Sequence, residues 1–132
     1  ETAAEALGRV PAEPRRAMLA RLAADPDRYM APWPTEPASY ATGILDDITY
    51  DWLPIVDGML ATGGFPLVAT DDDFRVAHRL GHTHTSIPVC PTGAAGLGGL
   101  LALQRDVAPD LTGERVALVF SGHQRPGDPV PS

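Results

Sequence analysis

The order of short apolar segments along this chain most constrains what it can fold into. Three runs are short enough to be buried strands: residues 66–69 (PLVA), 87–90 (IPVC) and 115–120 (RVALVF). Helical spacing separates them, first over 70–81 and then over 92–104. This strand–helix–strand–helix–strand order predicts an α/β fold. Because three short strands leave sheet edges and faces uncovered, we expect a partner chain or further sequence to complete the sheet.

Polar residues mark where these two helices are expected to begin. Thr70 is expected to cap the first helix, and the acidic residues 71–73 (DDD) then place carboxylates at the positive end of the helix dipole. Thr92 is expected to cap the second helix, which is rich in small residues and runs to Gln104. Each helix therefore starts directly after an apolar run.

The N-terminal part of the chain has a different pattern. Residues 13–24 predict a helix with Pro14 in its first turn, and an Asp-Pro pair stops it. Three prolines within residues 29–37 (YMAPWPTEP) exclude regular structure. This segment is expected to be an ordered loop or an arm that lies on another surface.

A further helix is expected to begin near Trp52 and to end at a Gly-Gly pair. Because Pro54 is tolerable only in a first turn, Asp51 is favoured over Thr49 as its cap. The patterns together divide the chain into three parts: residues 1–40, an N-terminal helix and proline-rich arm; residues 41–125, an α/β segment; and residues 126–132, a flexible tail.

Composition limits the classes of function. At 132 residues, of which 44% are hydrophobic and 20% charged, the chain is expected to be a globular protein with at most one domain. A net charge of −7, with ten basic residues scattered among seventeen acidic ones, argues against nucleic-acid binding. No apolar stretch approaches the roughly 20 residues that span a bilayer, and no signal-peptide pattern is present. A single cysteine fits a reducing cytoplasm, where we expect the protein to be.

The residue type that is absent has a chemical consequence. All ten basic residues are arginine, so the chain contains no lysine. No other side chain can hold an aldehyde cofactor as a Schiff base. Any such chemistry would need a lysine from another polypeptide or segment.

Two motifs point to a ligand site. Residues 91–97 (PTGAAGL) open a helix, and Ser121-Gly122-His123 directly follows the last apolar run. A serine at that point is expected at the carboxyl end of the sheet, where open α/β folds bind ligands. An ordinary turn at the end of a strand is the alternative interpretation.

Taken in order, these motifs resemble those of the fold-type-II pyridoxal-phosphate (PLP) enzymes, the tryptophan synthase β and threonine synthase family. That family has a Pro-Ser/Thr-Gly-Ala helix start and a final strand that ends in Ser-Gly or Thr-Gly. Residues 68–74 (VATDDDF) and 41–44 (ATGI) are also similar to family segments. The resemblance covers roughly the last two-thirds of the chain and implies the C-terminal part of the family's three-layer αβα large domain, incomplete on its own.

The resemblance implies roles for four residues in binding the cofactor. Ser121 takes the place of the hydroxyl that hydrogen-bonds the pyridine nitrogen, and Gly122 would let the backbone pass close to the ring. Thr92 and Gly93 would lie beside the cofactor pocket. A hydroxyl cannot protonate the ring nitrogen as a carboxylate partner does, which suits β-elimination and β-replacement reactions of amino acids.

The chain also departs from the family pattern. Cys90 stands where the family commonly has an acidic residue, and neither the lysine segment nor the phosphate loop is present. The resemblance therefore implies a segment or subunit of a lyase or synthase with no catalytic residue of its own. A larger chain or segment would supply the lysine and the phosphate loop, and the assembled enzyme could form a homodimer.

Other interpretations of the polar clusters remain open. The histidines His78, His82 and His84, together with Cys90, could suggest zinc, but three or four convergent ligands would be needed, so no metal is predicted. The acidic clusters at 46–47 and 71–73 fit helix caps better than paired catalytic carboxylates. The glycine-rich run 93–99 lacks the Lys-Ser/Thr of a phosphate loop. A non-catalytic binding or assembly module, docking through residues 29–37, is the competing class of function.

Overall fold

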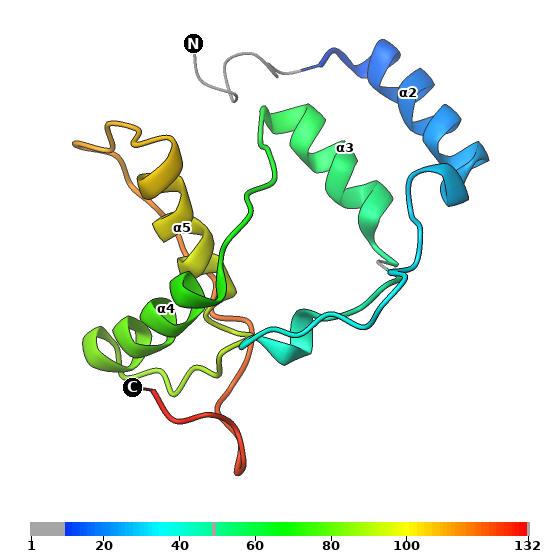
Figure 1. The fold of residues 1–132 in the computed structure, drawn as a ribbon. Coiled ribbons are helices and arrows are strands. Elements are labelled where there is room, and N and C mark those ends of the chain that lie inside the picture. The colour runs from blue at the N-terminus through cyan, green and yellow to red at the C-terminus, as the bar shows by residue number, and fades with distance from the viewer. Residues whose placement is uncertain (1–9, 49, 132) are drawn as a thin grey trace. The chain divides into compact units, whose positions relative to one another are not determined.

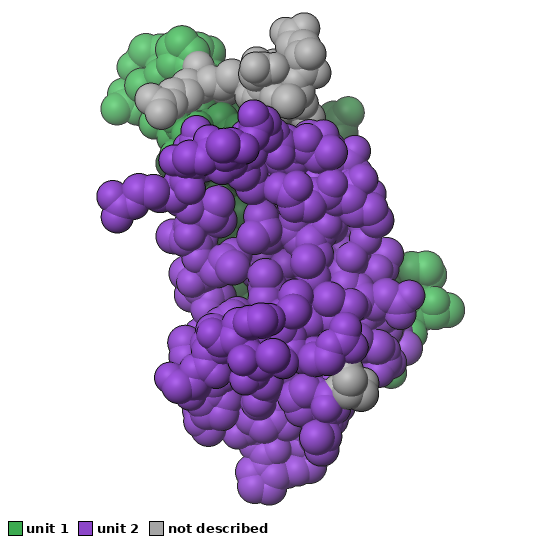
Figure 2. Space-filling model, turned by 90° about the vertical axis from the view of Figure 1, so that its left-hand side faces the viewer, with its two compact units in different colours: residues 1–36, 46–66 green, residues 37–45, 67–132 purple. Residues whose placement is uncertain are grey.

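The computed structural model describes residues 10–48 and 50–131, and these belong to two compact units (Figures 1 and 2). The first unit is formed within residues 1–36 and 46–66, and the second within residues 37–45 and 67–132. Chain length predicts one domain, whereas the helix that follows residue 50 groups with the N-terminal residues instead of with the predicted α/β segment.

The first unit contains two α-helices. Helix α2 spans Ala12–Ala24 and α3 spans Trp52–Thr62, and a short 3-10 helix, η1, covers Pro26–Arg28 (Figure 1). An ion pair of 2.7 Å joins Arg15 of α2 to Asp57 of α3. Neither helix contains a fully buried residue, so this unit has little core of its own.

The ends of α3 follow the sequence prediction. Asp51 occupies the N-cap position, although its side chain makes no capping hydrogen bond, and the alternative cap, Thr49, lies outside the described residues. At the other end Gly63 adopts a left-handed conformation with φ 76°. Only glycine does so without steric cost, which is why the helix stops there. Between the two helices, residues 30–37 form no regular structure, as their prolines require.

The second unit is organised around helices α4, Asp71–His84, and α5, Ala95–Asp106 (Figure 1). A 3-10 turn, η2, covers Thr42–Ile44. The predicted cap of α4 is confirmed: the Thr70 hydroxyl accepts from the Asp73 N–H at 3.2 Å, and the Asp73 carboxylate accepts from the Thr70 N–H at 2.7 Å. The helix continues to His84, beyond the predicted end at residue 81.

The predicted cap of α5 is wrong. Residues 91–94 form turns, and the α-helix begins at Ala95 with Ala94 at its N-cap position. The hydroxyl of Thr92 instead accepts a hydrogen bond of 3.0 Å from the Gly43 N–H, on a segment far away in the sequence. The Thr92 hydroxyl oxygen, which the local sequence pattern predicts as a helix cap, therefore accepts a tertiary hydrogen bond instead.

The three predicted strands do not form a sheet among the described residues. The pairing present there is one isolated antiparallel bridge, between Val89 and His123. Segments 66–69 and 115–120 make no backbone hydrogen bond with any described residue. A strand is defined by its neighbour, so apolar runs of this kind stay unpaired where no neighbouring strand is supplied. The α/β class therefore remains a prediction.

A small apolar core holds the second unit together. Ala77 of α4, Val89 and Ala94 are fully buried, and Leu97, Leu101 and Phe120 pack against them. Gly81 makes room for this packing, since a Cβ there would lie 2.7 Å from a methyl group of Val89. The core thus joins both helices to the apolar residues at 89 and 120. No helix in the described part of the chain is long and apolar enough to cross a membrane.

Candidate functional site

A cavity of about 360 Å³ in the second unit brings together three segments that are distant in the sequence. Its volume lies in the range of small-molecule sites. The segments are η2, the turn before α5 and the stretch after the last apolar run. The residues that line the cavity are Thr42, Gly43, Cys90, Thr92, Ser121, Gly122, His123, Arg125 and Asp128.

Three of the four predicted cofactor-binding residues line this cavity. Thr92, Ser121 and Gly122 contribute to its wall. Gly93 is buried directly behind Gly122 and does not line it. The sequence motifs therefore locate one common site, although they come from separate parts of the chain.

Close backbone packing explains the glycines. A Cβ on Gly93 would lie 2.5 Å from the backbone nitrogen of Gly122 and 2.7 Å from its Cα. A Cβ on Gly122 would lie 2.6 Å from the sulfur of Cys90. Real Cβ atoms do not approach other atoms this closely, so neither position can carry a side chain without a shift of its neighbours.

Backbone hydrogen bonds hold these segments against each other. The Ser121 N–H donates to the Gly93 carbonyl at 3.3 Å, and the Cys90 N–H donates to the Gly122 carbonyl at 3.2 Å. The Gly93 N–H approaches the sulfur of Cys90 at 3.3 Å. Together with the bond from Gly43 to Thr92, these contacts fix the cavity wall through the main chain.

The side chain of Ser121 has the freedom that a ligand contact requires. Ser121 is exposed, and its hydroxyl makes no hydrogen bond among the described residues. Arg125 and Asp128 also line the cavity and were not predicted. They are brought there by a turn in which the Asp128 carboxylate accepts from the Arg125 N–H at 2.7 Å. The prolines and glycine of residues 126–129 (PGDP) indicate a turn in the sequence. They do not indicate where the side chains of that turn point.

A buried histidine lies behind this cavity. His78 of α4 is completely buried, and its ring approaches Tyr40, Val89 and Gln124. Burial lowers the pKa of His78 below its usual value, because desolvation disfavours the charged ring, and the neighbouring His82 acts in the same direction. Hydrogen bonds to Gln124 and Val89 and the charge of Asp128 oppose this effect.

The histidines have contacts other than to a metal in the part of the chain that the structure describes. Among the described residues, no three His, Cys, Asp or Glu side chains converge as ligands. His78 and His82 both direct Nε2 to the carbonyl oxygen of Val89, at 3.0 and 2.7 Å. The imidazoles that sequence spacing brought together are thus occupied with backbone contacts.

Two of the three acidic residues at the start of α4, Asp71 and Asp73, have structural partners. Asp71 accepts from the Tyr40 N–H at 2.9 Å and from the Ser39 hydroxyl at 2.7 Å, and these bonds hold its pKa below the usual value. The Arg105 guanidinium beside Asp73, together with the Thr70 N–H, lowers the pKa of Asp73 to about 2. These contacts support the helix-cap interpretation over that of catalytic carboxylates.

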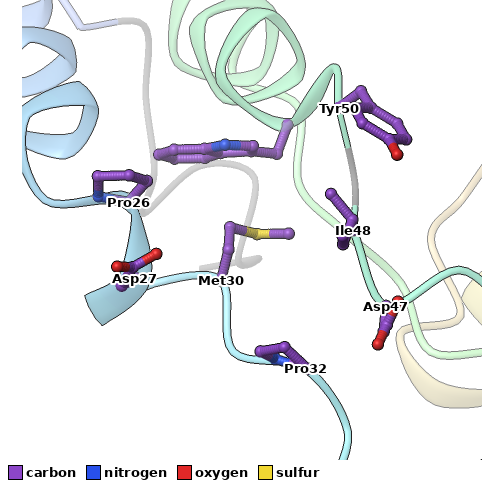
Figure 3. Close-up of a pocket in the computed structure, with 8 residues that line it drawn as sticks. Pro26, Asp27, Met30, Pro32, Asp47, Ile48 and Tyr50 are labelled. Atoms are coloured by element: carbon purple, nitrogen blue, oxygen red, sulfur yellow. The ribbon is translucent and has the colours of Figure 1, made fainter.

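A second cavity lies in the first unit, with a volume of about 380 Å³ (Figure 3). Its lining is largely apolar, with two carboxylates, and includes part of the proline-rich segment. Figure 3 shows Asp27 and Asp47 on opposite sides of Met30. The residues that line it are Pro26, Asp27, Met30, Pro32, Asp47, Ile48, Tyr50 and Trp52. None of the predicted cofactor-binding residues belongs to this cavity.

No protein-family model matches the chain, and no curated protein or solved structure matches it either. The resemblance to PLP enzymes therefore remains a prediction from the sequence motifs.

Proposed function

We propose that this chain is the C-terminal segment or subunit of a PLP-dependent lyase or synthase that acts on an amino acid, with threonine synthase-like β-elimination or β-replacement chemistry. The observation that carries the proposal is the convergence of Thr92, Ser121 and Gly122 on one cavity. The family resemblance places these residues at the cofactor or beside its pocket, and they were chosen from the sequence.

The cavity fits the ring of such a cofactor in two respects. The Ser121 hydroxyl has no hydrogen-bond partner among the described residues and faces a cavity of small-molecule size. Gly122 leaves the adjacent wall without a side chain, and Gly93 allows that wall to pack closely behind it. PLP, when bound, supplies an electron sink for reactions of amino acids.

Within that site the residues of this chain would bind the cofactor ring and orient it. The Ser121 hydroxyl would donate a hydrogen bond to the ring nitrogen without protonating it, since an alcohol is far too weak an acid. Gly122 would let the backbone pass close to the ring. Thr92 is held in place by the Gly43 N–H and keeps its methyl and hydroxyl groups beside the pocket.

Two properties favour a site shared with another polypeptide or segment. The chain contains no lysine, so the covalent anchor of the cofactor must come from elsewhere. Residues 116–120 are apolar, lack backbone partners among the described residues, and expose Val116 and Val119 by 51% and 75%. A segment with these properties is suited to the interior of a larger sheet. We expect the other part to provide the neighbouring strands, the lysine and the phosphate loop.

The test begins with the protein isolated from its natural source. A co-purifying larger chain, or a longer covalent form, with a visible absorption band that borohydride abolishes would support the proposal.

In that assembly, Ser121→Asp should sharply lower turnover while sparing assembly, because a carboxylate changes the protonation of the ring nitrogen. Ser121→Thr should retain most activity. Ser86→Asp, an exposed substitution outside the cavity, is the matched control. Unchanged kinetics in Ser121→Asp would remove Ser121 from the site.

A non-catalytic binding or assembly module is the second candidate. The cavity in the first unit favours it, because Met30 and Pro32 of the proline-rich segment form part of an apolar surface there. Such a module would unfold cooperatively as a stable monomer and would show no cofactor band beside a candidate partner. The PLP proposal instead expects the isolated chain to oligomerise through its exposed apolar run, which light scattering measures directly.

A further inference from the structure

One buried imidazole connects the three segments that form the cavity of the second unit. Nδ1 of His78 lies 2.8 Å from the Tyr40 hydroxyl, and Tyr40 precedes η2. Nε2 lies 3.0 Å from the carbonyl oxygen of Val89, which adjoins the cavity residue Cys90. The same Nε2 lies 3.0 Å from Oε1 of Gln124, which stands between two cavity residues. His78 does not line the cavity, but it contacts a neighbour of each segment that does.

The partners determine the form of the ring. The carbonyl oxygen of Val89 can only accept, so Nε2 of His78 carries a hydrogen and donates it. The side-chain amide of Gln124 donates through Nε2 to the carbonyl of Pro129 at 3.1 Å, which turns Oε1 toward His78 as a second acceptor. Nδ1 is then left with its lone pair, which accepts from the Tyr40 hydroxyl. In the neutral imidazole, the Tyr40 hydroxyl is the donor of this contact.

Protonation would change the contact with Tyr40. A hydrogen on Nδ1 would point at the hydroxyl hydrogen of Tyr40, so that the hydroxyl would have to turn and accept. The Arg75 guanidinium lies 4.3 Å from the centre of the Tyr40 ring, and places a second positive charge near this contact. Protonation would therefore reverse the hydrogen bond between His78 and Tyr40, the residue that leads into η2.

The other surroundings of His78 do not compensate for a buried charge. From the same helix, the His82 ring stands edge-on at 4.9 Å and shares the Val89 carbonyl. From the C-terminal turn, Asp128 is the facing carboxylate, but it already accepts from the Arg125 N–H. Gln124 is uncharged. A positive ring at this position would thus lack a dedicated partner.

We propose that His78 is the positioning residue of the cavity in the second unit, and that its protonation releases the Tyr40 segment and loosens the cavity wall. The cavity is then formed while His78 is neutral and is lost when the pH is low enough to protonate it. This inference goes beyond the proposed function and does not depend on it, because it concerns the wall of the cavity and not the ligand.

The experiment follows the histidine rings and the backbone amides of the whole chain by NMR as the pH is lowered. Because His123 lines the cavity and is itself an imidazole, the measurement is made in a His123→Gln background. The amide signals of Gly43 and Gly93 should change with the same midpoint as the His78 ring, below the ordinary histidine value. His78→Gln should abolish that transition. His84→Gln, an exposed change on the same helix, should preserve it.

A further variant separates a positioning role from a merely structural one. Tyr40→Phe removes the hydroxyl that ties the segment before η2 to His78. The Gly43 amide should then no longer follow the His78 ring, while the Gly93 amide should still follow it, because Val89 and Gln124 keep their contacts. The inference is overturned if the two amides do not follow His78, if their transition persists in His78→Gln, or if His78 fails to titrate before the chain unfolds. A Gly43 amide that still follows the His78 ring in Tyr40→Phe also overturns it. The absorption test of the proposed function is a separate measurement and can fail independently.

Discussion

Gly93→Ala is the substitution whose effect the structure determines most directly. The new methyl group would contact the backbone oxygen of Gly122 and lie 2.5 and 2.7 Å from its nitrogen and Cα. Main-chain atoms cannot rotate away as a side chain can, so the two segments must separate. Overpacking in a closed site costs about 1–3 kcal/mol. Because three backbone atoms of one residue are involved, we expect the upper end, about 3 kcal/mol of unfolding free energy.

The chain provides a control within the same glycine-rich run. Gly99 lies inside α5, and a Cβ there would meet nothing within 4 Å. Gly99→Ala should therefore stabilise the helix by about 0.5–1 kcal/mol, because alanine loses less backbone entropy than glycine. The same substitution at two positions of this run is thus expected to change the free energy of unfolding in opposite directions.

Urea unfolding followed by amide NMR signals of α4 and α5 measures both variants. Fluorescence is unsuitable, since Trp33 and Trp52 both belong to the first unit. With a urea dependence of about 2 kcal/mol per molar, Gly93→Ala should lower the midpoint by about 1.5 M. Equal midpoints for the Gly93 and Gly99 variants would show that Gly93 and Gly122 do not pack as described, and the close-packed wall of the cavity would have to be abandoned.

Two further predictions concern α4. Thr70→Ala removes the helix cap and should cost about 1 kcal/mol of unfolding free energy. Its control is Thr83→Ala, which removes only an exposed hydroxyl bonded to the preceding turn and should be near neutral. Equal losses of stability in thermal unfolding would contradict the capping box. Because Arg105 and Thr70 lower the pKa of Asp73 from 3.8 to about 2, its carboxylate stabilises the fold above pH 3.8, and that contribution should be lost as the pH falls toward 2. Asp73→Asn should lack this part of the acid dependence, measured as the free energy of unfolding against pH.

Local sequence patterns predicted the helices and helix ends that depend on residues adjacent along the chain. Three of the helices follow from periodicity, from prolines in first turns and from the left-handed glycine after α3. The cap of α4 was predicted because Thr70 and Asp73 are both within one turn of the helix start. The cap of α5 was predicted wrongly, because the hydroxyl of Thr92 has a partner on a segment that no local pattern connects to it.

The predicted strands show the same limit. The apolar runs at 66–69 and 115–120 have the composition of strands, but a ladder requires a second strand in register, and the described residues contain none for them. Motif order placed Thr92, Ser121 and Gly122 in one site, whereas Arg125 and Asp128 enter it through a turn whose geometry no motif indicated.

The sequence by itself determined the helix boundaries set by proline, glycine and capping residues, and it determined the absence of lysine, because these depend only on residue type and on neighbours along the chain. Only the tertiary structure decided that Gly93 must lack a side chain, since the atoms it would strike belong to Gly122. It also decided that His78 is buried and bonded to three segments, because burial and hydrogen-bond partners arise from residues that meet only when the chain has folded.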